Sequence, residues 1–285
     1  MTANNSGEFL QQKYETAPKF LERRQADRIH IAEIRKDERP EDWSIGVGDY
    51  FSPFSDKQKL VFPPRKDTSE LLGTEITLYE AMKKIIDRRT HDKVADPAIF
   101  LDFGGMWGTT WGRLANKFKN EVEDGKVCFV VSNIQLNPKL SLPDSESFNE
   151  GTIDAVNKYR HLVNFIQCDA NELSGIKIML PNGNVISLNN HLALIHEKMA
   201  LTHGSIPDTD LPTLAENLEE GGILMFASDT MHTNIPERNL LQDEINKAFV
   251  VGKKNLQKLG YKDQNIRNEC GYKIYSKKES RLLFV

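Results

Sequence analysis

The stretch AIFLDFGGMWGTTWGRLANKF, residues Ala98–Phe118, decides how the rest of the chain is interpreted. It starts with an apolar run that ends in an acid, Asp102, and then carries four glycines and two tryptophans. A buried strand that stops at an acid, turns on glycine and leads into an amphipathic helix is typical of a ligand-binding turn. Glycine there allows positive φ and close approach of the backbone to a ligand. A plain strand-to-helix turn is the alternative interpretation of Asp102 and Gly104.

Composition narrows the class of protein. The chain has 285 residues, of which 39% are hydrophobic and 27% charged, an ordinary globular composition. The near balance of 37 basic and 41 acidic residues gives no electrostatic footprint for nucleic acid and favours a small-molecule substrate. Three cysteines without a CxxC pair argue against a disulfide framework. Neither a signal peptide nor a long apolar segment is present, so we expect a cytoplasmic protein without membrane contact.

The chain divides into two regions at about residue 71. Residues 1–71 combine charged sequence with helical spacing and a proline-rich, aromatic-rich stretch, which indicates a helical and loop-rich extension or lid. Residues 72–285 alternate apolar runs with amphipathic segments, the pattern of βαβ units. The strands expected there are 99–103, 126–134, 162–169, 191–197, 221–229, 271–276 and 281–285, with a separate hairpin over 176–188. The helices expected are 78–91, 109–124, 148–161, 211–220 and 240–260.

This pattern predicts an α/β fold with a doubly wound, mostly parallel seven-stranded sheet and a C-terminal antiparallel hairpin. Right-handed crossovers place the carboxyl ends of the parallel strands at one edge, where such sheets bind ligands. The last two strands, 271–276 and 281–285, are expected to form the hairpin.

Over roughly Thr77 to Val285 the chain resembles the class I S-adenosylmethionine-dependent methyltransferases, with a degenerate first motif. That motif is an apolar strand, an acid and Gly-x-Gly-x-Gly at the start of a helix. Asp102 matches the acid, Gly104 the first glycine and Gly108 the last, whereas Met106 stands at the middle one. The resemblance implies that Asp102, Gly104, Gly105, Trp107 and Gly108 surround the amino-acid end of S-adenosyl-L-methionine.

The resemblance also places residues near the other parts of this cofactor. Gln135, or alternatively Asn133, stands where the family has an acid for the ribose hydroxyls. Asp169 and Ala170 follow the third strand, where the family contacts adenine. The segment LAENLEEGGILMF, residues 214–226, closely resembles the helix, turn and fifth strand of the family.

The histidines after strand ends are the candidates for acid–base chemistry. His196 and Glu197 end the fourth strand, at a position that in the family faces both cofactor and substrate, and His203 follows. Histidine titrates near neutral pH, so His196 and His203 are candidate general bases, together with Glu197. No HxH or HxxxH spacing occurs, and we therefore expect no metal site. An ordinary hydrogen-bonded histidine is the alternative for each.

The sequence therefore predicts an S-adenosyl-L-methionine-dependent methyltransferase that acts on a small-molecule acceptor. Methyl transfer requires chiefly alignment of the acceptor and exclusion of water, which is why the acceptor cannot be read from the sequence. Met106 and Gln135 favour an alternative, a non-catalytic module that keeps the fold and has lost the cofactor. A nicotinamide-dependent oxidoreductase is disfavoured because GxGxxG is absent and no acid ends the second strand.

Overall fold

The three-dimensional structure is a computed structural model of the chain. It describes residues 59–61, 75–104, 108–132, 158–166, 168, 170–180, 183–197, 207–227, 236–268 and 272–277. Of the predicted extension, only 59–61 fall within these ranges, as do four residues of the predicted helix 148–161. None of the helices in the described ranges is both long enough and apolar enough to cross a membrane.

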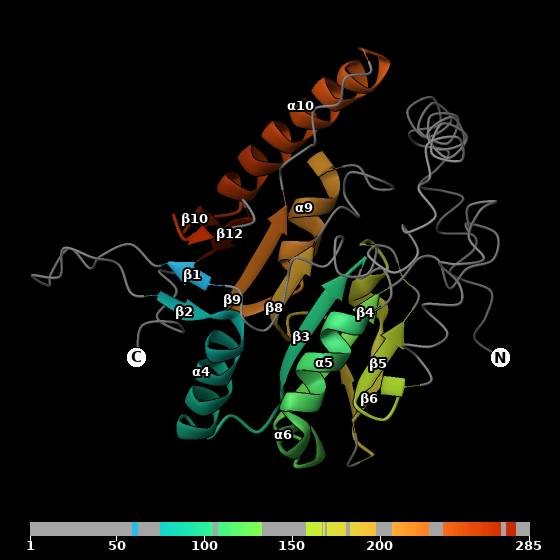
Figure 1. Ribbon diagram of the computed structural model, residues 1–285, viewed down its shortest axis with the longest axis vertical. Coiled ribbons are helices and arrows are strands. Elements are labelled where there is room, and N and C mark those ends of the chain that lie inside the picture. The colour runs from blue at the N-terminus through green and yellow to red at the C-terminus, as the bar shows by residue number, and fades with distance from the viewer. Residues whose placement is uncertain are drawn as a thin grey trace, which may run out of the picture.

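Seven strands form the central sheet in the order β10-β12-β9-β8-β3-β4-β5 (Figure 1). From β9 to β5 every neighbouring pair is parallel, whereas β12 lies antiparallel between β9 and β10. The strands are β3 Ala98–Phe103, β4 Val127–Ser132, β5 Val163–Ile166, β8 Leu192–Glu197, β9 Leu218–Ala227, β10 Lys262–Asp263 and β12 Tyr272–Ser276. The predicted fold class, mostly parallel with a C-terminal antiparallel hairpin, is confirmed.

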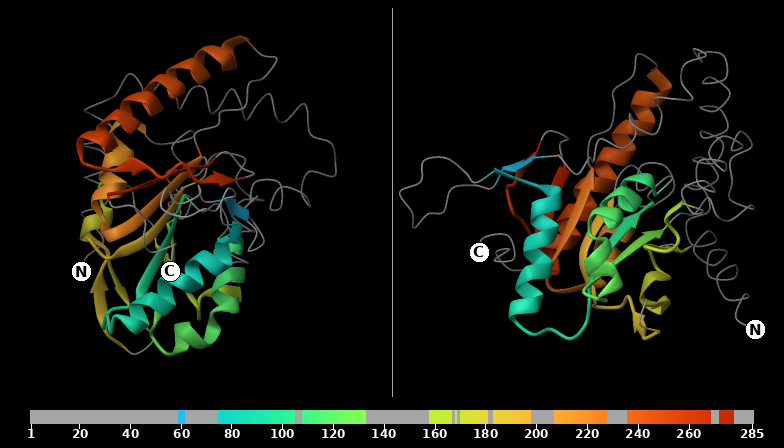
Figure 2. Two further views of the ribbon diagram at one scale, coloured as in Figure 1. Left: turned by 90° about the vertical axis from the view of Figure 1, so that its left-hand side faces the viewer. Right: turned by 60° about the horizontal axis from the view of Figure 1, so that its bottom comes forward.

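Helices cover both faces of this sheet. Helices α4 Leu78–His91, α5 Thr109–Lys117 and α6 Lys119–Glu123 pack on one face. Helices α9 Pro207–Glu216 and α10 Pro236–Lys258, the 3₁₀ turn η2 Leu173–Gly175 and the hairpin of β6 Lys177–Met179 and β7 Val185–Ser187 contribute to the core on the other face. Figure 2 shows the sheet between the α4–α5 layer and the α9–α10 layer.

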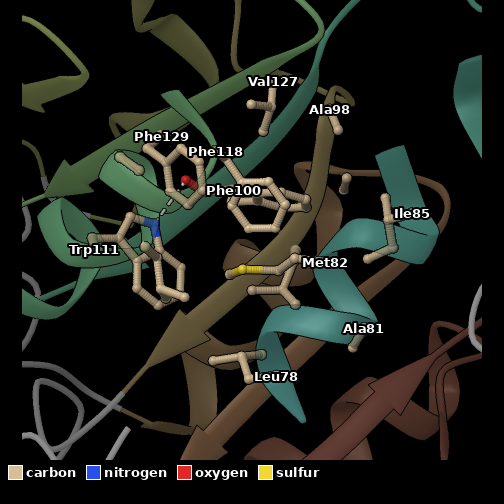
Figure 3. Close-up of a cluster of buried hydrophobic side chains, with 14 of the residues drawn as sticks. Leu78, Ala81, Met82, Ile85, Ala98, Phe100, Trp111, Phe118, Val127 and Phe129 are labelled. Carbon is tan, nitrogen blue, oxygen red and sulfur yellow. Dashed lines mark hydrogen bonds between the residues drawn. The ribbon is translucent and has the colours of Figure 1, made fainter. Parts of the chain in front are cut away.

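The α4–α5 side of the core is built from large apolar side chains (Figure 3). Phe100 of β3 and Phe129 of β4 meet edge to face at 5.5 Å between ring centroids, and Phe118 stacks on Phe129 at 5.9 Å. Trp111 of α5 is fully buried, and its indole Nε1 donates to the carbonyl of Phe100 over 3.0 Å. Complete burial of one such side chain contributes about 1.5–3 kcal/mol, so this cluster fixes α5 on the sheet.

Two helix ends confirm local predictions. Helix α4 begins as expected at Leu78, because Thr77 and Glu80 form a reciprocal capping box with hydrogen bonds of 3.1 and 2.7 Å. Helix α10 ends before Gly260, which has φ of 88°, and the Tyr261 amide donates back to the Leu256 carbonyl over 3.0 Å. Gly260 therefore serves as a glycine C-cap at the end of this helix, which the sequence predicted to end at residue 260.

Two other boundaries differ from the prediction. The helix expected over 109–124 breaks at Phe118, whose ring is buried against the sheet and whose backbone (φ −100°, ψ 25°) leaves the helical region. The helix expected over 211–220 occupies 207–216 instead. Strand β9 begins at Leu218, not at 221, because buried Leu218 pairs with Leu192 before a bulge at the Gly-Gly step.

In the terminal hairpin, strand β12 pairs with a different strand from the one expected. Strand β12 pairs with β10, which precedes it in the chain, and with β9 on its other side. The segment 281–285, which was expected to pair with it, lies outside the described residues. A second, three-stranded sheet in the order β11-β1-β2 joins β1 Lys59–Val61 to β2 Glu75–Thr77 and β11 Arg267–Asn268. The sequence did not indicate this sheet, and it ties the chain before residue 71 to the main fold.

Candidate active site

The two described glycines of the turn after β3 have the positive φ that the sequence indicated. Gly104 has φ of 71°, and its amide donates to the Ser132 carbonyl at the end of β4 over 2.9 Å. Gly108 has φ of 69° and is the N-cap residue of α5, where it supplies no side-chain cap. Both positions lie in the left-handed region that favours glycine. The amino end of α5 stands at the carboxyl edge of the sheet, since a methyl group on Gly108 would lie 3.3 Å from the side chain of Val131 in β4.

Gly108 and the next glycine, Gly112, are also required by packing. A methyl group on Gly108 would lie 2.7 Å from Cε1 of Phe165, and one on Gly112 would lie 2.3 Å from Cδ2 of Tyr159. Real Cβ atoms do not approach carbon so closely, since carbon–carbon contacts are optimal at about 3.5–4.0 Å. Because these two glycines have no side chain, α5 can lie close to β5 and to Tyr159, which precedes β5 in the sequence. Packing alone thus explains two of the four glycines between residues 98 and 118, without a ligand.

Asp102, at the end of β3, belongs to a buried chain of hydrogen bonds. Its Oδ1 lies 2.7 Å from Nδ1 of His196, at the end of β8. The other ring nitrogen, Nε2, lies 3.2 Å from the hydroxyl oxygen of Tyr272, the first residue of β12. The exposed fractions of Asp102, His196 and Tyr272 are 6%, 4% and 3%. This series of hydrogen bonds joins β3, β8 and β12 at the edge where the sheet is expected to bind its ligand.

Aromatic rings hold the imidazole of His196 in place. The indole of Trp111 stacks on it, with centroids 5.3 Å apart and planes 20° apart. The ring of Tyr272 lies 5.3 Å away at 37°. Both ring nitrogens of His196 have hydrogen-bond partners. Direct transfer of a proton from a methyl acceptor to His196 therefore requires that its hydrogen bond with Tyr272 or Asp102 is broken first. The candidate role of His196 as a general base stays a prediction.

Two other candidates lie apart from this chain. Glu197 is 0% exposed, and because neighbouring residues of a strand point to opposite faces, its side chain leaves β8 on the side away from His196. The structure therefore does not bring its carboxylate together with Asp102. Ala170 is also completely buried and packs in the core on the α9–α10 side. The ligand contacts expected of Glu197 and Ala170 remain untested predictions.

The other candidate residues lie outside the described ranges. These are Gly105, Trp107, Asn133, Gln135, Asp169 and His203. Met106, which stands in place of the middle glycine, belongs with them. Their expected places around the amino-acid end, the ribose and the adenine stay predictions.

Two described residues of this edge were not singled out by the sequence. Tyr272 was expected only as the beginning of a strand. Ser132, 1% exposed at the end of β4, donates from its hydroxyl to the Cys168 carbonyl over 3.0 Å and thereby ties the β4 end to the segment after β5. The available signal was positional, since both residues stand at the edge where the sheet is expected to bind its ligand. Neither residue belongs to a recognisable motif.

No protein-family model and no curated protein matches the sequence. Similar solved structures include a putative S-adenosyl-L-methionine-dependent methyltransferase from Methanococcus maripaludis, at 15% identity over 71% of this chain and 88% of that one, with a TM-score of 0.39. A SAM-dependent methyltransferase from Aquifex aeolicus is 17% identical over 67% and 87%, with a TM-score of 0.39.

A third similar structure is a SAM-dependent methyltransferase from Geobacter sulfurreducens in complex with S-adenosyl-L-homocysteine. It is 15% identical over 64% of each chain, with a TM-score of 0.34. With identities and TM-scores this low, the assignment of the fold depends on the strand order of the chain itself.

Proposed function

We propose that the protein is an S-adenosyl-L-methionine-dependent methyltransferase that acts on a small-molecule acceptor. The observation that carries this proposal is the position of Asp102. It is the last residue but one of strand β3, and after Phe103 follows a glycine turn in which Gly104 and Gly108 both have positive φ. In open α/β sheets, this edge is where ligands bind.

The residues present fit the amino-acid end of such a cofactor. A buried carboxylate is a suitable partner for an ammonium group, and the amino end of a helix for a carboxylate. Asp102 supplies the first, and the first turn of α5, which Gly108 leaves without a side-chain cap, supplies the second. The predicted contacts at the ribose (Gln135 or Asn133) and the adenine (Asp169) complete the proposed site. When bound, this cofactor supplies an electrophilic methyl group on a sulfonium.

The chain's own contribution is then orientation and exclusion of water. The rings of Trp111 and His196 are buried and stack on each other, so they give the contact between His196 and Asp102 a rigid support. A rigid site favours alignment of an acceptor with the methyl group, and alignment supplies most of what methyl transfer requires. Glu197, His196 and His203 remain the candidates for removing a proton from the acceptor.

The extension is the proposed source of acceptor specificity. Strand β1 lies within residues 1–71 and pairs with β11, which precedes β12 and Tyr272 in the chain. Removal of residues 1–58, which keeps β1, is expected to spare cofactor affinity and to abolish acceptor binding. Loss of both, or of neither, contradicts this part of the proposal.

The cofactor proposal is tested by isothermal titration with S-adenosylmethionine and S-adenosylhomocysteine. We expect saturable binding of both, and a loss of about tenfold or more in the Asp102→Asn variant, because a hydrogen bond to a charged group contributes about 1.5–3 kcal/mol. Asp124→Asn is the matched control, since that acid is exposed at the end of α6. Absence of heat and of thermal shift at millimolar ligand refutes the proposal, and binding of a reduced nicotinamide cofactor instead points to an oxidoreductase.

A non-catalytic binding module is the second candidate function. The buried contact between Asp102 and His196 favours it, because Asp102 already has a partner there and this contact can serve stability alone. This candidate predicts that neither adenosyl compound binds. It also predicts that Asp102→Asn lowers the free energy of unfolding while changing no ligand affinity.

A further inference from the structure

We propose that Tyr272 is a positioning residue, which acts through His196 to orient the carboxylate of Asp102 toward the ammonium group of an adenosyl amino-acid ligand. The inference rests on the proposed function and assigns a role to a residue outside the glycine turn. It depends on the continuous chain of contacts from β12 across β9 and β8 to β3.

The sheet places the three side chains on one face at one edge. Asp102 and His196 are direct partners in the parallel pairing of β3 and β8. Tyr272 pairs with Ala227, at the end of the intervening strand β9. Because β12 runs antiparallel to the others, its first residue lies where their last residues lie. The hydroxyl of Tyr272 thereby reaches the imidazole from the far side of β9.

The donors and acceptors give this chain a direction. An ionised carboxylate only accepts hydrogen bonds. Nδ1 of His196 therefore carries a proton and donates a hydrogen bond to Oδ1 of Asp102. We assign the neutral form to this imidazole, in which Nε2 accepts and the Tyr272 hydroxyl is its donor. Tyr272 thus selects the tautomer of His196 that binds Asp102.

The same contacts fix the plane of the carboxylate. His196 cannot rotate freely, because its ring is packed against both Trp111 and Tyr272. The bond to Oδ1 therefore sets the direction of the second carboxylate oxygen, Oδ2, which we assign to the ligand's ammonium group. Hydrogen bonds of this supporting kind fix both the tautomer and the orientation of the group that they hold.

The test compares two ligands in the Tyr272→Phe variant, which removes one hydroxyl and keeps the buried ring. S-Adenosylhomocysteine carries the amino-acid end, whereas 5′-methylthioadenosine lacks it. We expect the affinity for S-adenosylhomocysteine to fall about three- to tenfold, the effect of one buried hydrogen bond, and that for methylthioadenosine to stay unchanged. Tyr275→Phe is the matched control, because Tyr275 is as buried on the same strand but packs on the opposite face.

The outcomes separate this inference from the proposed function. In the Asp102→Asn background, Tyr272→Phe should have no further effect on S-adenosylhomocysteine, because the two changes act on one contact. Equal weakening of both ligands, or an unchanged affinity for S-adenosylhomocysteine, overturns the inference and leaves the cofactor proposal intact. Failure of the wild type to bind either ligand overturns both.

A measurement without ligand covers the case in which the variant does not fold. Two-bond ¹H–¹⁵N correlation of the histidine rings in the wild type reports the tautomer of each, and a His196→Gln variant identifies the signals of His196. We expect a neutral ring protonated at Nδ1. A ring protonated at Nε2, or at both nitrogens, contradicts the role assigned to Tyr272.

Discussion

The packing of α5 against the sheet can be tested by substituting alanine for Gly112. The backbone of Gly112 is ordinary helix, so alanine alone is expected to stabilise this position by about 1 kcal/mol. However, the added Cβ would lie 2.3, 2.4 and 2.7 Å from three ring atoms of Tyr159. These distances are about 1 Å shorter than the roughly 3.5 Å at which carbon atoms normally meet.

The collision cannot be relieved by a small movement. Tyr159 is 7% exposed and packs in the same core as Trp111 and Phe118, so its ring has little room to rotate. Forcing an extra methyl group into a packed core costs typically about 1–3 kcal/mol. We expect so large an overlap to have a cost at the upper end of this range. After the gain in helix propensity, we expect Gly112→Ala to destabilise the protein by about 2 kcal/mol and to lower Tm by about 3 °C.

Urea unfolding followed by circular dichroism measures this change, with Gly175→Ala as the control, because nothing lies within 4 Å of a methyl group added there. In a Tyr159→Ala background the collision is absent, and Gly112→Ala should then stabilise by up to about 1 kcal/mol. An increase in stability in the wild-type background refutes the packing of α5 described above, and with it the position of the glycine turn.

Other predictions follow from the buried contacts. Trp111→Phe removes the hydrogen bond to Phe100 and part of the stack on His196, and should cost about 2–4 kcal/mol in urea unfolding; a change below 1 kcal/mol contradicts this. Arg89→Met leaves the half-buried Glu219 and the carbonyls of Asp96 and Pro97 without their partner and should cost about 2–3 kcal/mol, whereas an unchanged Tm would show the contacts to be dispensable. Burial raises the pKa of Glu219. The free energy of unfolding of the wild type relative to Glu219→Gln should therefore be greatest below about pH 4.5 and decrease as the pH rises through the folded-state pKa. Urea unfolding across this pH range measures the difference, and an increase with rising pH contradicts the prediction. Burial also raises the pKa of Cys128 to about 12, so a thiol reagent at pH 8 should label Cys128 only after unfolding, and rapid labelling of the native protein would contradict its burial.

The sequence predicted the parallel strands and their common edge because those features are local. Apolar runs identify β3 and β8, the amphipathic pattern identifies α4, and right-handed crossovers then bring the end of β3 to the end of β8. Asp102 and His196 were therefore both expected at one edge although 94 positions separate them. The break of α5 at Phe118 depends on what the ring packs against, which no local pattern records.

The composition of the site itself depends on register, which the sequence does not contain. The pairing of β3 with β8 decides that His196, and not Glu197, shares a face with Asp102. Tyr272 reaches the site only because β12 is inserted antiparallel between β9 and β10. Likewise, the need for glycine at position 112 comes from Tyr159, 47 residues away in the chain.

A crystal structure with S-adenosylhomocysteine tests the central claim most directly. The account predicts that the ligand lies across the carboxyl edge of β3 and β4, with its ammonium group within hydrogen-bond distance of Asp102 and its carboxylate at the first turn of α5. A ligand bound on another face, or an edge that stays empty at millimolar ligand, contradicts it.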